Sequence, residues 1–85
     1  MKRLTLRNEA GELVPTTNVN DVLIKLAAYE DFHEEVLREY DRICEQIDER
    51  KQQGKMKGVT ANQLIAQKMS LQNILLYFKR FGIGE

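Results

Sequence analysis

The sequence predicts a mainly α-helical protein with a short N-terminal β-hairpin, followed by a long helix and a C-terminal helix that together form an antiparallel helical hairpin. Two observations support this fold class. The segment from Asp21 to Gln53 contains neither glycine nor proline and repeats apolar residues at helical spacing. A second helical pattern runs from Thr60 to Phe81, after a polar loop that contains Gly54. With 85 residues, the chain has room for one domain, 1–85.

The first fifteen residues carry the pattern of a β-hairpin. Leu4 and Leu6 alternate with polar residues, a turn segment with Gly11 follows, and a second short apolar run ends at Pro15. An isolated hairpin of this size is only marginally stable in water. We therefore expect residues 1–15 to pack on a helix.

The long helix is expected over 21–53. Its apolar residues fall into two series at heptad spacing, which make a stripe broader than the seam of a bare coiled coil: Leu26, His33, Tyr40 and Ile47, and Val22, Tyr29, Val36 and Ile43. The segment from Asp31 to Glu34 also has the form of a capping box. The sequence leaves open whether the helix breaks near Asp31 or continues through it.

The C-terminal helix is expected over 60–81, capped by Thr60 and ended at Gly82. Apolar residues cover more of its circumference than one antiparallel neighbour can bury. A two-helix hairpin also has little core, so the pattern favours a homodimer or a larger oligomer. The expected oligomer interface consists of Leu64, Ile65, Met69, Leu71, Ile74, Leu75, Phe78 and Phe81.

Charge is segregated along the chain although the formal net charge is zero. From Glu30 to Glu49 there are nine acidic residues and two arginines, whereas from Arg50 to Gly84 there are seven cations and no acid. The acids are compatible with a solvated surface that holds ordinary ion pairs and with a surface that a basic partner recognises. The candidate partner-binding residues are Glu34, Glu35, Glu39, Asp41, Glu45, Asp48 and Glu49.

Groups suited to catalysis are scarce. His33 is the only histidine, Cys44 the only cysteine and Ser70 the only serine, so no catalytic triad or zinc cluster can be assembled. No glycine-rich phosphate loop is present. We expect a protein that is not an enzyme and needs no cofactor or metal, with Cys44 as a small buried hydrophobe.

A second interpretation concerns nucleic acid. The segment from Thr60 to Gln72 resembles the first helix and turn of a helix-turn-helix, with Ala66 at the position where two helices cross. In that interpretation the candidate phosphate contacts are Lys68, Lys79 and Arg80. Ser70 stands where the turn glycine is usual, and one continuous helix fits the same residues.

The first 31 residues resemble a group of small proteins from phages and integrated elements of Gram-positive bacteria. The resemblance rests on Arg3-Leu4-Thr5-Leu6-Arg7-Asn8 and on Leu26-Ala27-Ala28-Tyr29-Glu30-Asp31. Most members of the group have no known activity, so the resemblance implies a genomic context and no functional residue. Beyond Asp31 the chain departs from it.

The phage context implies a stoichiometric accessory protein that binds itself and a host or phage protein. Its sharpest form is an inhibitor of a host defence system, of the anti-CRISPR or anti-restriction kind, which uses the acidic helix. The alternatives are a DNA-binding regulator and an oligomeric adaptor in phage replication or assembly. The chain lacks a secretory signal and a span of membrane length, so we expect it in the cytoplasm of the bacterial host, with no membrane partner.

Overall fold

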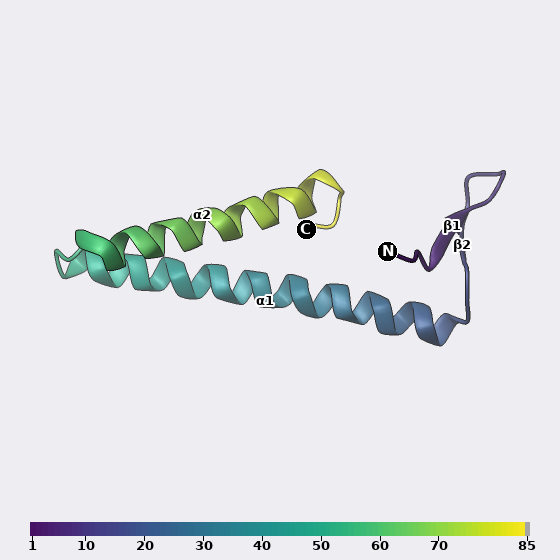
Figure 1. Ribbon diagram of the computed structural model, residues 1–85, viewed down its shortest axis with the longest axis horizontal. Helices are drawn as coiled ribbons and strands as arrows, with labels where there is room; N and C mark the ends of the chain where they lie inside the picture. Colours follow the sequence, from purple (N-terminus) through teal and green to yellow (C-terminus); the bar gives the residue numbers. More distant parts are fainter. Residues whose placement is uncertain (85) are drawn as a thin grey trace. The chain divides into compact units, whose positions relative to one another are not determined.

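The computed structural model describes residues 1–84. Its elements, in chain order, are β1 (Thr5–Arg7), β2 (Leu13–Pro15), α1 (Val19–Gln52) and α2 (Gly58–Arg80). The predicted order of a hairpin and two helices is confirmed (Figure 1). The sequence predicts one domain, and the contacts divide the chain into two compact units, 1–33 and 34–85, so that α1 contributes to both.

The β-hairpin forms because Asn8 and Gly11 shape its turn. The Asn8 side-chain oxygen accepts a hydrogen bond from the Glu12 amide at 2.9 Å, and its carbonyl accepts one from the Gly11 amide, also at 2.9 Å. Gly11 has a φ of 79°, a conformation that glycine adopts without steric cost. The strands pair antiparallel, with Leu6 opposite Val14. This agrees with the predicted hairpin.

Both outer edges of this two-stranded sheet are blunted. The inward hydrogen bond from the Thr16 amide to the Leu4 carbonyl implies that Thr5 and Pro15 direct their backbone groups outward. The outward carbonyl of Thr5 accepts a hydrogen bond from Arg3 Nε at 3.2 Å. Pro15 has no amide hydrogen to offer. Neither edge therefore presents a full set of free backbone groups.

Helix α1 begins two residues before its predicted start because Asn18 is its N-cap. The Asn18 side-chain oxygen accepts a hydrogen bond from the Asp21 amide at 2.9 Å, and the Asp21 carboxylate accepts one from the Asn18 side-chain amide at 3.0 Å. The helix continues through Asp31 without interruption, which decides the alternative that the sequence left open. It ends at a glycine-based C-cap, where the Lys55 amide donates to the Arg50 carbonyl and Gly54 has a φ of 69°.

Helix α2 begins at Gly58, not at the predicted Thr60, which lies inside its first turn. Lys57 occupies the N-cap position without a side-chain hydrogen bond, so the expected threonine cap is wrong. The helix is unbroken from Gly58 to Arg80, and no turn interrupts it at Ser70. It ends at Arg80, one residue before its predicted end, and the predicted stop residue Gly82 follows with a φ of 71°, while the Ile83 amide donates to the Phe78 carbonyl at 2.9 Å.

The core lies between the two helices in the unit of residues 34–85. Ile43 and Ile47 of α1 pack with Leu64 of α2, and Met56 and Leu71 cover this cluster. Val36 and Ala61 are also buried. The antiparallel packing of α1 against α2 is confirmed (Figure 1).

Four residues of α1 that were predicted to lie in the core are not buried. Leu26 and Tyr29 are 51% and 52% exposed, so their assignment to the core is wrong, whereas His33 and Tyr40 are half-buried. In the unit of residues 1–33, the residues that line a hollow with α1 are Met1, Arg3, Leu4 and Thr5. These few residues lack the surface needed to cover a whole helical stripe.

Candidate interaction surfaces

The predicted acidic residues all lie on α1, between Glu34 and Glu49. With about 100° of rotation per residue, Glu34, Asp41 and Glu45 fall on the side opposite Ile43 and Ile47. This places them away from the core, and all three are exposed. Asp48 and Glu49 flank that side and are exposed as well. Five of the seven candidates therefore form one solvent-facing strip, which we call the acidic strip: Glu34, Asp41, Glu45, Asp48 and Glu49.

The other two acidic candidates are engaged within the helix. Arg38 donates to the Glu35 carboxylate at 2.8 Å, and Arg42 donates to the Glu39 carboxylate. Both pairs have i,i+3 spacing, and exposed pairs of this kind stabilise a helix by only a few tenths of a kcal/mol. The sequence treated the seven acids as one group, whereas the helical rotation separates these two from the strip.

Some side chains of the predicted apolar interface are buried between the two helices, and others are exposed. Leu64 is buried against α1. The half-buried members are Leu71, Ile74, Leu75 and Phe78. The exposed members are Ile65, Met69 and Phe81, at 42%, 58% and 76% exposure. Leu76 and Tyr77, which the predicted interface omitted, are also exposed, at 56% and 58%.

The two broad sides of the helical hairpin differ in chemistry. On one side, the Gln72 side-chain amide donates to the Tyr40 hydroxyl at 3.2 Å and links α2 to α1. Helical rotation places five apolar side chains on this side, together with the charged Lys51 of α1 and Lys79 of α2. We call this surface the open face: Leu37 and Cys44 of α1, and Ile65, Met69 and Leu76 of α2. Cys44 is half-buried here, in contrast to the buried position predicted for it.

The opposite side contains a hollow of about 420 Å³ that is lined by both polar and apolar side chains. The Glu39–Arg42 ion pair lies along its α1 wall, and Gln67 and Ser70 lie along its α2 wall. Ile43, Ala66 and Leu71 also line the hollow.

The candidate phosphate contacts do not form one cluster. Lys68 is half-buried on the border between the core and the open face, and Lys79 and Arg80 are exposed in the last turn of α2. The Arg80 guanidinium lies over the Tyr77 ring, 5.2 Å from its centroid. Because α2 is continuous at Ser70, the helix-turn-helix interpretation loses its turn and its second helix. Residues 60–81 therefore do not form the predicted helix-turn-helix.

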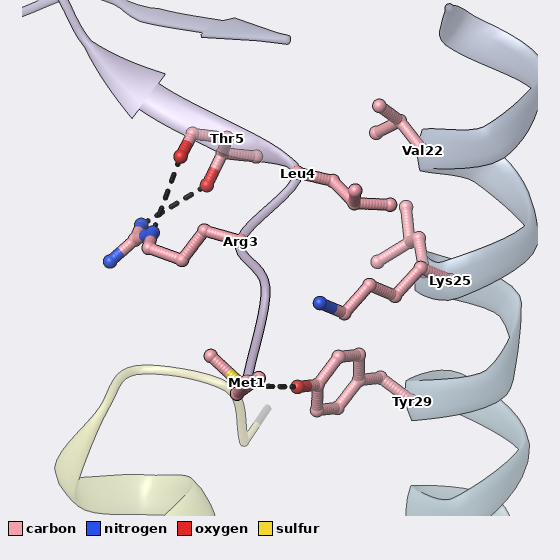
Figure 2. Close-up of a pocket in the computed structure, with 8 residues that line it drawn as sticks. Met1, Arg3, Leu4, Thr5, Val22, Lys25 and Tyr29 are labelled. Atoms are coloured by element: carbon pink, nitrogen blue, oxygen red, sulfur yellow. Dashed lines mark hydrogen bonds between the residues drawn. The ribbon is translucent and has the colours of Figure 1, made fainter. Parts of the chain in front are cut away.

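A separate apolar hollow lies in the unit of residues 1–33, between the N-terminal residues and α1 (Figure 2). Leu4 points toward Val22, and the Tyr29 hydroxyl lies 4.0 Å from the Met1 sulfur. Lys25 Nζ donates to the Lys2 carbonyl at 2.7 Å. This hollow has a volume of about 310 Å³, and of the strand residues Thr5 alone lines it.

Within residues 1–84, no three histidine, cysteine, aspartate or glutamate side chains are grouped so that they could hold a metal ion. The helices in the same range are not apolar over a length that would cross a membrane. Comparisons of the chain with protein-family models, with curated proteins and with solved structures gave no significant match.

Proposed function

We propose that this chain is a non-catalytic, phage-type accessory protein that associates with itself through its helical hairpin and binds a host or phage protein through the acidic strip. In its sharpest form it inhibits a nuclease of a host defence system by occupying a basic nucleic-acid channel. In this proposal the chain acts by presenting a binding surface and needs no catalytic side chain. The resemblance of the first 31 residues to phage proteins supplies the context.

The observation that carries the proposal is the ratio of exposed to buried apolar side chains. Among the described residues, five hydrophobic side chains are buried, whereas seventeen large ones are exposed. Scattered exposed hydrophobes are ordinary, but contiguous apolar surface on a small protein usually marks an interaction site. On the open face, Ile65, Met69 and Leu76 occupy one side of α2. Association would remove this surface from water.

The acidic strip supports the second half of the proposal. Its carboxylates stand on a helix and lie away from the core. A regular row of negative charge on a rigid helix can complement a basic groove and accelerate the encounter with it. Arg38 and Arg42 make ion pairs with Glu35 and Glu39, which lie outside the strip.

Charge reversal tests the role of the acidic strip. The variant Glu34→Lys with Glu45→Lys should lose the protein that the native chain captures from a lysate of infected Gram-positive bacteria, because two carboxylates that contact a basic surface become cations. The measurement is quantitative mass spectrometry of the captured protein. Circular dichroism and thermal unfolding should stay close to those of the native chain, since both residues are exposed.

The matched control is Glu9→Lys with Glu12→Lys, which makes the same change in net charge on the exposed β-hairpin turn. This control should capture the partner as the native chain does. If both double variants retain the partner, the acidic strip is a solvated surface. If both lose it, net charge and not the strip governs binding.

A further inference from the structure

The turn between α1 and α2 carries the largest group of positive charges within residues 34–84. Four cations fall within residues 50–57, a stretch without an acid, and the next cation along the chain is Lys68. The first turn of α2 contains no acid either. We call this group the basic turn: Arg50, Lys51, Lys55 and Lys57.

Hydrogen bonds fold the basic turn back on itself and occupy its carbonyl groups. The Lys55 amide donates to the Arg50 carbonyl at 2.8 Å, and the Gly54 amide donates to the Lys51 carbonyl at 3.1 Å. The Arg50 guanidinium donates to the Lys55 carbonyl at 3.0 Å. Arg50 is half-buried and holds the turn together, whereas the three lysines are exposed. This end of the helical hairpin therefore presents ammonium groups, while the carbonyl acceptors beside them are already used.

The three exposed lysines have no counter-ion in the part of the chain that the structure describes. Over residues 1–84, their ammonium groups take part in no ion pair, in contrast to Arg38 and Arg42 of α1. The acids nearest in sequence are Asp48 and Glu49, which are exposed on α1 and, in the same range, form no ion pair with them. Each lysine is a compact, unpaired point charge that can meet an anion from outside the chain.

We propose that the basic turn binds the phosphodiester backbone of a nucleic-acid duplex through Lys51, Lys55 and Lys57. This inference goes beyond the proposed function and does not rest on it. The lysines are spread around an exposed turn at the end of the helical hairpin (Figure 1), so successive phosphates of a polyanion can meet separate ammonium groups. Residues 50–57 contain no aromatic side chain on which an unpaired base could stack, which favours a duplex over a single strand.

An anionic membrane surface is the competing partner, and the surroundings of the turn argue against it. Binding at a bilayer interface requires apolar side chains beside the cations. Residues 52–54 are two glutamines and a glycine, and Met56 packs against the core cluster. Within residues 50–60, Val59 is the one large hydrophobic side chain that is exposed. The basic turn therefore offers charge without an apolar surface to enter the lipid.

The expected salt dependence follows from the release of counter-ions. Each neutralised phosphate contributes about 0.9 to the slope of log affinity against log salt concentration, so three lysines give a slope of about 2.7. Such a slope weakens binding about 40-fold when the salt concentration rises from about 50 to 200 mM. The net charge of the chain is zero, so a dependence of this size would report local contacts. Lysine reads no base edge here, so the affinity should not depend on base sequence.

Fluorescence anisotropy with a short labelled DNA duplex tests the proposal on the full chain. The native chain should bind the duplex at low salt with the slope given above. The variant Lys51→Gln with Lys55→Gln and Lys57→Gln should bind about tenfold more weakly or worse and should lose most of the salt dependence. Its circular dichroism should match that of the native chain, because all three side chains are exposed.

The matched control is Lys68→Gln with Lys79→Gln and Arg80→Gln, which removes the same charge from α2 outside the turn. This control should lose several-fold less affinity than the turn variant and should keep the native salt slope. Equal losses in the two triple variants would overturn the proposal, because net charge and not the turn would then govern binding. A native chain that does not bind the duplex at low salt would overturn it as well.

Two competitors test which anion the turn recognises. Unlabelled duplex of unrelated sequence should displace the labelled duplex. Inorganic phosphate at matched ionic strength and vesicles of phosphatidylglycerol should not displace it. Displacement by inorganic phosphate would indicate a site for a single anion, and displacement by the vesicles would indicate a membrane-binding surface. Either result would overturn the assignment of the basic turn to a duplex.

Discussion

Replacing Ile43 by alanine should destabilise the protein far more than replacing Ile24 by alanine, although both residues belong to α1. Ile43 is 2% exposed and packs with Ile47 and Leu64, whereas Ile24 is 62% exposed. The substitution removes three carbon groups. Each buried carbon contributes about 0.8 kcal/mol, which gives about 2.4 kcal/mol before the cavity is counted. With the cavity, Ile43→Ala should cost about 2–4 kcal/mol.

The same change at Ile24 should alter the free energy of unfolding by less than about 0.5 kcal/mol. Little buried surface is lost there, and alanine is the better helix former by about 0.4 kcal/mol. The total stability of an 85-residue chain is about 4–13 kcal/mol, so the loss at Ile43 is a large fraction of it. Ile24→Ala is thus the control for side-chain chemistry and for helix propensity together.

The assay is urea unfolding followed by far-ultraviolet circular dichroism, with all variants at one chain concentration because association would contribute to the measured stability. The midpoint should fall clearly for Ile43→Ala and stay nearly constant for Ile24→Ala. Equal losses in the two variants would refute the packing of α1 on α2 described here. A graded variant, Ile43→Val, should lose about 0.5–1.5 kcal/mol.

Two further substitutions test the helix ends. Asn18→Ala should destabilise the protein by about 1 kcal/mol, because the Asp21 amide loses its acceptor, and Asn18→Ser, which keeps an acceptor and adds no second carboxylate beside Asp21, should restore most of it in the same urea assay. Gly54→Ala should cost about 1 kcal/mol, because a β-carbon is strained at a φ of 69°, and Gly54→Asn should cost less. A stable Gly54→Ala variant would mean that this C-cap is not maintained in solution.

Periodicity in the sequence was sufficient to predict the elements of the fold. The absence of glycine and proline over thirty residues and the recurrence of Val36, Ile43 and Ile47 predicted α1 and its core side. The helix starts were predicted less well. Asn18 and Thr60 are both cap-type residues, and only the backbone conformation decides that Asn18 caps a helix while Thr60 lies within one. Capping signals are abundant in sequences, so they locate a helix end only to within a few residues.

The sequence predicted which residues belong to the candidate surfaces, but it did not predict which of those residues face the same side. The apolar set of α2 contained Leu64, which is buried in the hairpin, together with Ile65 and Met69, which are exposed. The rotation of α2 about its own axis separates them, and that rotation depends on which residues of α1 it meets. Pairs such as Tyr40 and Gln72 are distant in sequence. Periodicity along one helix carries no information about such pairs.

The blunted edges of the β-hairpin have a consequence for how the protein behaves when it is concentrated. An open sheet edge can recruit further strands without limit, which leads to fibrous aggregates. Here the Thr5 carbonyl is occupied by Arg3, and Pro15 interrupts the other edge. Growth by strand addition is therefore suppressed at both ends of the sheet. We therefore expect the concentrated protein not to form fibres by strand addition.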